Sequence, residues 1–235
     1  MEDSINHLGQ IVGATVVDWV APNFPTLDIL PGHYCSVVPL DIENHAKALF
    51  ESYQADKQGR MWTYLPYGPF NSAEEYARLL EKLITQPDQQ FYSVVDMKTK
   101  NVLGIAAYLR INPDAGSIEV GHLSYSPSLQ KTTIATEAMY LMMNKIFEMG
   151  YRRYEWKCNS LNEASKSAAL RLGFQFEGVF RQSMVIDGRN RDTAWYSIID
   201  SEWTMLKPMF NSWLSESNFD ASGTQLKSLS EFVKF

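Results

Sequence analysis

The sequence predicts a mixed α/β domain with a central sheet of about six or seven strands and four main helices. Three observations lead to this class. The chain has 235 residues, of which 45% are hydrophobic and 13% aromatic, enough for one packed interior and too few for two independent cores. Its first half ends in three short β-type segments joined by hairpin-length loops, which predicts an antiparallel meander. Its second half repeats the order strand, helix, strand, which predicts parallel crossovers.

In the first half, a short β-type run at residues 33–38 precedes a helix at 41–54. Asp41 can cap this helix, and its apolar residues recur on one face. Ser72 can cap a second helix that reaches Thr85. The three β-type runs of the meander follow at 91–96, 102–111 and 117–125.

The second half begins with a helix at 132–147. A strand around Trp156 and a helix at 162–172 come next, and Gly173 ends that helix. The pair Asp187-Gly188, a strong hairpin signal, joins two last strands. They are predicted at 174–186 and 193–199, and we expect Trp156, Leu172 and Phe174 to lie in the core.

Composition changes divide the chain into three parts. Residues 1–31 are rich in proline and glycine and are predicted to be a leader that packs on the domain without a core of its own. Residues 32–205 form the domain, and residues 206–235 form a polar tail. A possible docking helix in this tail would use Leu226, Leu229, Phe232 and Val233.

Charge and cysteine usage exclude several classes of function. With 27 acidic and 21 basic residues the net charge is −6, which disfavours a protein dedicated to nucleic-acid binding. Cys35 and Cys158 lie far apart, and the chain has no Cys/His cluster at ligand spacing, so we expect neither a disulfide scaffold nor a metal site. The first residues lack a secretory signal, and no apolar run is long enough to span a bilayer. We therefore expect a soluble cytoplasmic protein that does not bind membranes.

A polar turn at residues 126–136 directly precedes the predicted helix at 132–147. The free N–H groups of such a helix start, with the hydroxyls of Thr132, Thr133 and Thr136, would form a phosphate-binding nest. A plain polar turn whose threonines only cap the helix is the alternative.

This turn and the order of elements resemble the GNAT superfamily of acetyl-CoA-dependent N-acetyltransferases. In that family a Gln/Arg-x-x-Gly-x-Gly/Ala loop holds the pyrophosphate of acetyl-CoA, and residues 130–135 fit this pattern except that Thr133 replaces a glycine. The Cβ of Thr133 could crowd the pyrophosphate, or its hydroxyl could replace an amide contact. The resemblance implies that acetyl-CoA lies between the strands at 118–125 and 154–158. It implies ten cofactor-binding residues: Leu123, Tyr125, Gln130, Lys131, Thr132, Thr133, Ile134, Ala135, Thr136 and Asn162.

Further motifs resemble one branch of this superfamily, the ribosomal-protein N-terminal acetyltransferases. They are Ile118–His122, Asn162–Ser165, Leu172–Phe174 and Glu177–Arg181, and the similarity runs from about residue 33 to 203. The resemblance implies an acyltransferase that moves an acetyl group to a primary amine, on a small molecule or a protein N-terminus, in a ternary complex. The alternative is a noncatalytic acyl-CoA-binding or sensing module, because Thr133 departs from the loop pattern and Ala169 stands where many relatives have a tyrosine.

Acetyl transfer needs a base for the amine, a donor for the oxyanion and a proton for the leaving thiolate. Glu119 is the first candidate for the base, with an ion pair on the sheet face as the alternative. His122, expected on the opposite face of the same strand, is the second candidate, although a structural role is open. The resemblance places the hydroxyl of Ser165 near the sulfur of CoA; the alternative is a serine that bonds its own helix start. A backbone amide at 122–125 could bind the oxyanion.

The loop at residues 60–70 combines aromatic residues with two prolines. Its rings are predicted to form a wall for the acceptor amine, with a lid packed on the sheet as the alternative: Trp62, Tyr64, Tyr67 and Phe70. The sequence leaves a monomer and a homodimer equally open.

Overall fold

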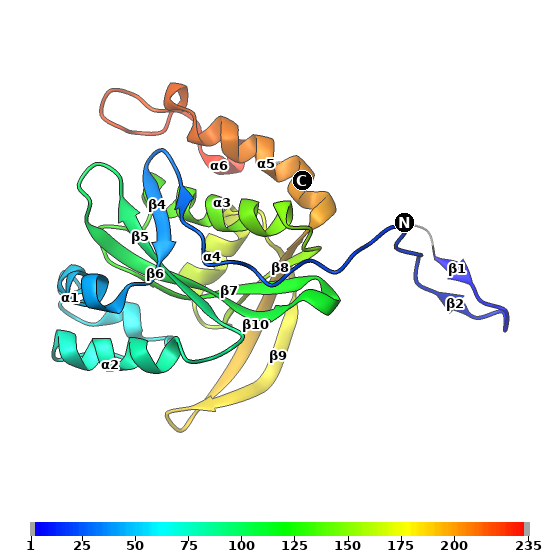
Figure 1. Ribbon diagram of the computed structural model, residues 1–235, viewed down its shortest axis with the longest axis horizontal. Helices are drawn as coiled ribbons and strands as arrows, with labels where there is room; N and C mark the ends of the chain where they lie inside the picture. The colour runs from blue at the N-terminus through cyan, green and yellow to red at the C-terminus, as the bar shows by residue number, and fades with distance from the viewer. Residues whose placement is uncertain (1–2, 233–235) are drawn as a thin grey trace.

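The computed structural model describes residues 3–232, and its centre is an eight-stranded sheet (Figure 1). The strand order is β3-β4-β5-β6-β7-β8-β10-β9. Neighbouring strands are antiparallel except for β7 and β8, which are parallel. The strands are β3 (Leu30–Pro31), β4 (Cys35–Pro39), β5 (Gln90–Asp96), β6 (Val102–Asn112), β7 (Ser117–Tyr125), β8 (Arg153–Asn159), β9 (Gln175–Ile186) and β10 (Arg189–Ile199).

The mixed sheet with one parallel pair confirms the predicted fold class. Its eight strands exceed the expected six or seven, because Leu30–Pro31, at the end of the predicted leader, pairs with β4. The second predicted crossover, from β8 to β9, does not place its two strands side by side. β10 lies between β8 and β9 and is antiparallel to both. The hairpin between β9 and β10 turns at Asp187 and Gly188, both with positive φ, as the sequence predicts.

Two helices cover one face of the sheet (Figure 1). They are α1 (Ile42–Tyr53) and α2 (Ala73–Leu83), and the predicted caps are present, since Asp41 accepts the N–H of Asn44 and Ser72 accepts that of Glu75, both at 3.2 Å. The loop between them contains the 3₁₀ turn η1 (Arg60–Trp62). The apolar sides of these elements pack on β5 and β6 and form a first core.

The opposite face carries α3 (Thr133–Glu148), α4 (Glu163–Arg171) and α5 (Asp200–Leu214) (Figure 1). Between these helices and the sheet lies the larger core. Trp156, Leu172 and Phe174 are at most 5% exposed there, which confirms their prediction as core residues.

Helix α5 runs across position 205, where the sequence analysis placed the end of the domain. Leu206, Phe210 and Trp213 are buried in the larger core, so this helix is part of the domain's packing. Beyond it lie η3 (Glu216–Asn218) and the short helix α6 (Leu229–Phe232). Leu229 is fully buried while Leu226 is 64% exposed, and Val233 lies outside the described residues.

The leader divides into a docked part and a free part. Residues 19–31 lie along the domain, where Tyr151 Oη donates to the carbonyl of Asn23 and the ammonium of Lys145 lies 2.6 Å from Asp28. Residues 3–17 form a small hairpin, β1 (Ser4–Ile5) and β2 (Ile11–Val12), that stands away from the domain (Figure 1). No helix within residues 3–232 is long and apolar enough to cross a membrane.

Candidate active site

The sheet opens between its two parallel strands. β7 and β8 pair only from Ser117 and Arg153 to Val120 and Trp156. Beyond these residues β7 continues along β6 and β8 along β10, so the facing edges of the two strands separate. The register of β6 and β7 shifts at the same place, and His122 has a left-handed backbone with φ of 49°. This bulge bends β7 away from β8 and creates the split.

The loop at 126–132 brings the N-terminus of α3 to this split. Lys131 adopts a left-handed conformation with φ of 61°, which turns the chain into the helix. In the described part of the chain, the N–H groups of Lys131, Thr133 and Ile134 have no hydrogen-bond acceptor. Three free amides at the positive end of a helix are typical of an anion-binding site.

Two of the three threonine hydroxyls predicted for the nest are used within the protein. Thr132 Oγ1 accepts the N–H of Ala135 at 3.1 Å and donates to the carbonyl of Leu129 at 2.6 Å. Thr136 is 3% exposed, and its Oγ1 accepts from the guanidinium of Arg171 at 3.1 Å. These two hydroxyls therefore cap and brace the helix start, as in the capping alternative, while the amides remain for a ligand.

Other predicted cofactor residues shape the walls of the split. Gln130 Nε2 donates to the carbonyl of Tyr125 at 2.8 Å and closes the loop. Leu123 and Tyr125, from the bent part of β7, pack against the larger core. Asn162 caps α4 through a 3.0 Å bond from the N–H of Ser165 to its Oδ1.

Ser165 lies on the opposite side of the split, in the first turn of α4. Its Oγ accepts a hydrogen bond of 2.9 Å from the indole N–H of Trp156. The hydroxyl is therefore held by a strand residue, and no bond to its own helix start is present among the described residues. Because the oxygen accepts from Trp156, its own proton is available for donation, and the buried thiol of Cys158 on β8 is one partner within hydrogen-bond reach.

Glu119 is nearly buried and lies among cations. Its Oε2 is 2.6 Å from Arg110 Nη1 and 2.8 Å from Lys157 Nζ, which also contacts Glu155 at 2.7 Å and lies 3.7 Å from the centre of the Trp195 ring. The predicted ion pair on the sheet face is thus present. The second oxygen, Oε1, is turned toward Gly121, where a Cβ would approach it to 3.7 Å. Gly121 is the first residue beyond the pairing of β7 with β8, so Oε1 lies at the start of the split.

His122 packs between aromatic rings on the face covered by α1 and α2. Its Nδ1 is 2.8 Å from Tyr67 Oη, and its ring lies 5.0 Å from that of Phe91. Burial, with the nearby charge of Arg110, lowers the pKa of His122 to about 4, so its imidazole is neutral near pH 7. Burial likewise raises the pKa of Tyr67 to about 12.

The expectation that Glu119 and His122 point to opposite faces is wrong. Ile118 and Val120 pack in the larger core, so Glu119 between them points to the face of α1 and α2. His122 contacts Phe91, which belongs to the core on this same face. The bulge at His122 breaks the alternation on which the expectation rested.

The four aromatic residues of the 60–70 loop have different surroundings. Trp62 is 7% exposed and packs against Phe70, so these two belong to the core beneath the loop. Tyr67 reaches His122 of β7, whereas Tyr64, 37% exposed, donates from its Oη to the carbonyl of Leu161 at 3.1 Å. The loop thus contacts both sides of the split, β7 through Tyr67 and the segment between β8 and α4 through Tyr64.

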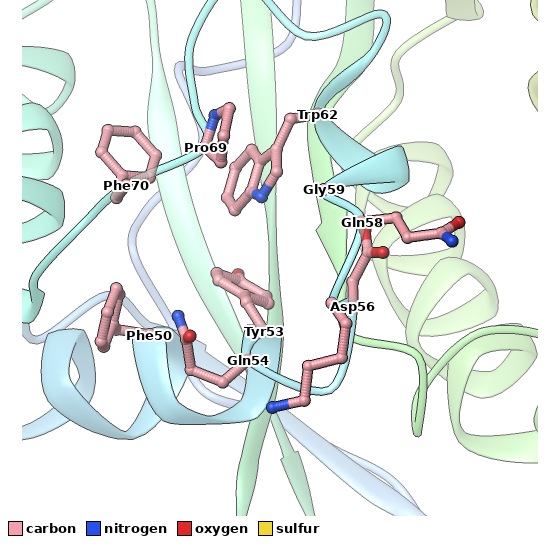
Figure 2. A pocket seen from close by; sticks show the side chains of 10 residues that line it. Phe50, Tyr53, Gln54, Asp56, Gln58, Gly59, Trp62, Pro69 and Phe70 are labelled. Carbon is pink, nitrogen blue, oxygen red and sulfur yellow. The ribbon is translucent and has the colours of Figure 1, made fainter.

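A separate cavity of about 290 Å³ lies between α1 and this loop (Figure 2). Its walls include Phe50, Tyr53, Trp62 and Phe70, and none of its lining residues comes from β7, β8 or α3. Asp56 at its rim accepts the N–H of Met61 at 2.8 Å and thereby holds η1. This cavity is therefore distinct from the split. Within residues 3–232, no three His, Cys, Asp or Glu side chains are placed to hold a metal ion.

Sequence reasoning missed two contacts of the split. The pairing of Lys157 with Glu119 depends on the register of β7 and β8, and the stacking of Tyr67 on His122 depends on the bulge. The sequence did contain a signal for the first contact. Lys157 follows the core residue Trp156 along its strand, as Glu119 follows the core residue Ile118, so both side chains would be expected on the face opposite that core.

A mixed sheet that opens at a parallel pair, with a helix start beside the opening, defines the acetyltransferase class that the sequence resembles. The chain belongs to the GNAT acetyltransferase family, since the family model described as acetyltransferase (GNAT) domain matches residues 37–175. It is an N-acetyltransferase.

Individual relatives agree with this assignment. The chain is 29% identical over 166 residues to the ribosomal-protein-serine acetyltransferase of Escherichia coli strain K12, a match that covers 68% of this chain and 90% of that protein. A crystal structure of a GCN5-related N-acetyltransferase from Brucella melitensis is 40% identical, with a TM-score of 0.89 over 92% of this chain and 99% of the other. A structure described as a ribosomal alpha-N-protein acetyltransferase in complex with coenzyme A shares the fold, with a TM-score of 0.63 at 22% identity and coverage of 74% and 99%.

Proposed function

We propose that this protein transfers an acetyl group directly from acetyl-CoA to a primary amine, on a small molecule or a protein N-terminus, in a ternary complex. The observation that carries the proposal is the split between β7 and β8, with three free amides of the α3 start beside it. Two relatives support the two substrates: one is named for acetylation of a ribosomal-protein serine, and one holds coenzyme A.

The residues around the split fit acetyl-CoA. The amides of Lys131, Thr133 and Ile134 would hold the diphosphate, since they point unpaired from a positive helix end. Leu123 and Tyr125 would flank the pantetheine on β7, and Asn162 on the α4 side. When bound, acetyl-CoA supplies an activated acyl group as a thioester.

The chain's own groups would then move two protons. The amine must lose a proton as its nitrogen bonds to the acyl carbon, and Glu119 Oε1, at the start of the split, or the neutral His122 takes it through water. As the carbon–sulfur bond breaks, the O–H of Ser165, oriented by Trp156, donates a proton to the thiolate, and the serine oxygen takes a proton from water as the base releases the amine proton to solvent. A backbone N–H between His122 and Tyr125 stabilises the oxyanion.

A thiol-release assay tests the activity. The protein is incubated with acetyl-CoA and a panel of amines, amino acids and N-terminal peptides, and free CoA is measured. We expect CoA release that depends on the acceptor. Tight binding of acetyl-CoA with no acceptor-dependent release would instead support a noncatalytic acyl-CoA-binding module.

The variant Thr133→Pro tests the diphosphate site. Thr133 is the first residue of α3, where proline is tolerated, and Thr132 before it is extended with φ of −100° and ψ of 166°, as proline requires. The substitution removes one free N–H, and a hydrogen bond to a charged group is worth roughly 1.5–3 kcal/mol. We therefore expect CoA affinity to fall about 10- to 100-fold without loss of folding. The control Thr133→Ala keeps the N–H and should bind nearly normally; equal affinity in both variants would contradict this site.

A further inference from the structure

Residues 3–20 of the leader expose an unusual amount of aliphatic surface. Ile5, Ile11, Val17 and Val20 are 72%, 76%, 74% and 79% exposed, and Leu8 is 69% exposed. Soluble monomers rarely expose so many large apolar residues in one segment. We call residues 3–20 the arm.

The arm has no support from its own domain over most of its length. In the described chain, the hydrogen bonds of residues 3–17 stay within the hairpin, for example from the N–H of Gln10 to Asn6 Oδ1 at 3.0 Å. A lone two-stranded hairpin is marginally stable in water. At its base the arm is fixed, because Trp19 lies beneath the guanidinium of Arg152 and Asn23 is bonded to Tyr151.

A second apolar surface lies along β9, the edge strand of the central sheet opposite β3. Phe176, Phe180 and Val185 are 54%, 57% and 77% exposed, and Val179 and Met184 are about half exposed. One side of β9 pairs with β10, and in the described residues its other side pairs with no strand. An unpaired edge strand of twelve residues, five of which expose large apolar side chains, is a template for pairing with another strand.

We propose that two copies of this chain form a dimer by exchanging arms, each arm lying along β9 of the other copy. A second copy is the occupant that satisfies both surfaces, because every chain carries one arm and one edge and a twofold arrangement buries all four. Burial of the arm's aliphatic side chains alone would remove roughly 700 Å² per copy, comparable with the roughly 800 Å² that each partner buries in a stable complex.

Charge does not oppose this pairing. The charged side chains of the described arm are the acidic Asp3 and Asp18. The β9–β10 hairpin has no net charge, because three arginines are matched by three acidic residues: Arg181, Arg189 and Arg191, and Glu177, Asp187 and Asp192. This inference does not depend on the acceptor or on the catalytic residues.

Sedimentation equilibrium of the full chain tests the dimer. We expect a mass of twice 26.8 kDa at micromolar concentration. Ile11→Asp and Val185→Asp place a charge on the two proposed surfaces and should each weaken the dimer at least tenfold, while acetyl-CoA binding shows that the domain is still folded. The control His7→Asp adds the same charge at an exposed polar position of the arm and should leave the dimer intact. A monomeric full chain, or a dimer that resists Ile11→Asp, would overturn the proposal.

Cross-linking tests which surface receives the arm. Proteins carrying Ile5→Cys or Val185→Cys are mixed and treated with a short bismaleimide; Cys35 and Cys158 are both buried and should react little. We expect a heterodimer joined between the arm of one chain and β9 of the other. In the double variant, cross-links confined within a single chain would show that the arm folds back on its own β9. A dimer that is not weakened by Val185→Asp, and that gives no cross-link between the arm and β9, would show that the arm binds elsewhere. Each of these two outcomes would refute the exchange.

Discussion

Replacement of Glu137 by glutamine should strongly destabilise the fold. This carboxylate, 4% exposed on α3, accepts three backbone N–H groups of the chain entering β4: those of His33, Tyr34 and Cys35, at 2.8, 2.7 and 2.6 Å. One oxygen serves His33 and the other serves both remaining amides. The segment that enters β4 and the first turns of α3 are thereby tied together by one carboxylate side chain.

The structure allows an estimate of the loss. Each hydrogen bond to a buried charge contributes roughly 1.5–3 kcal/mol, against about 1 kcal/mol for a neutral acceptor. The amide of glutamine can accept with its single oxygen, but its NH₂ group must then face at least one backbone N–H. The weakened bonds and one unpaired donor lower the free energy of unfolding, and the easier burial of a neutral group partly offsets this. We expect a net loss of about 3 kcal/mol in the free energy of unfolding. For a domain of this size this corresponds to a fall in Tm of roughly 6 to 12 °C.

Urea and thermal unfolding of the purified variants measure this effect. The matched control is Glu148→Gln on the same helix, where the carboxylate is 57% exposed and pairs with Lys207 at 2.8 Å, and we expect a loss below about 1 kcal/mol. Gly32→Ala should act in the same direction as Glu137→Gln, because its Cβ would lie 2.6 Å from the Glu137 carboxyl group. If Glu137→Gln costs no more than the Glu148→Gln control, the three amide bonds do not stabilise the fold as argued.

Three further predictions concern the split. The pKa of His122 is about 4 in the folded protein and about 6.5 in an unfolded chain, so the contribution of the neutral imidazole to stability is complete above pH 6.5 and is lost as the pH falls to 4. His122→Gln should therefore reduce the pH dependence of the free energy of unfolding in urea between pH 6.5 and 4. A variant with the same pH dependence as the wild type would contradict the burial argument. Ser165→Ala should lower kcat by roughly 10²-fold or more with little change in CoA affinity, whereas Trp156→Phe, which keeps the hydroxyl, should cost less; equal losses would show that only the hydrogen bond matters. Glu119→Gln should lower kcat by roughly 10²-fold or more with little change in CoA affinity, and a kcat close to that of the wild type would assign this carboxylate a purely structural role.

The regular elements were predictable because each depends on a short stretch of sequence. The caps Asp41 and Ser72, the hairpin turn at Asp187 and the core residue Trp156 all follow from local patterns that tertiary contacts do not override. Helix α5 was missed because serines and Pro208 suggest a break, while the buried Phe210 and Trp213 that stabilise it show their role only in the folded domain, where they pack against Tyr140 of α3 and Arg171 of α4.

The candidate site was only partly predictable, since its geometry depends on pairs that are distant in sequence. The free amides at Thr133 follow from the helix start, which the sequence marks clearly. The position of His122 depends on a bulge in the pairing of β6 with β7, and a histidine at this position does not by itself predict a positive φ. The cations on Glu119 come from Arg110 and from Lys157, on the neighbouring strands, and only the sheet register brings them together.

A contact between side chains links the two helices at the sides of the split. Arg171, near the end of α4, donates to Thr136 in the first turn of α3, and its guanidinium lies 5.2 Å from the centre of the Trp213 ring of α5. Burial lowers the pKa of Arg171, but a guanidinium stays protonated far above neutral pH, so the cation must be held by these partners. Thr136 Oγ1 donates in turn to the carbonyl of Thr132, the cap of the helix that offers the free amides. The packing of α5, an element outside the 37–175 match to the family, therefore supports the contact between α4, which carries Ser165, and the start of α3, where we propose that the diphosphate binds.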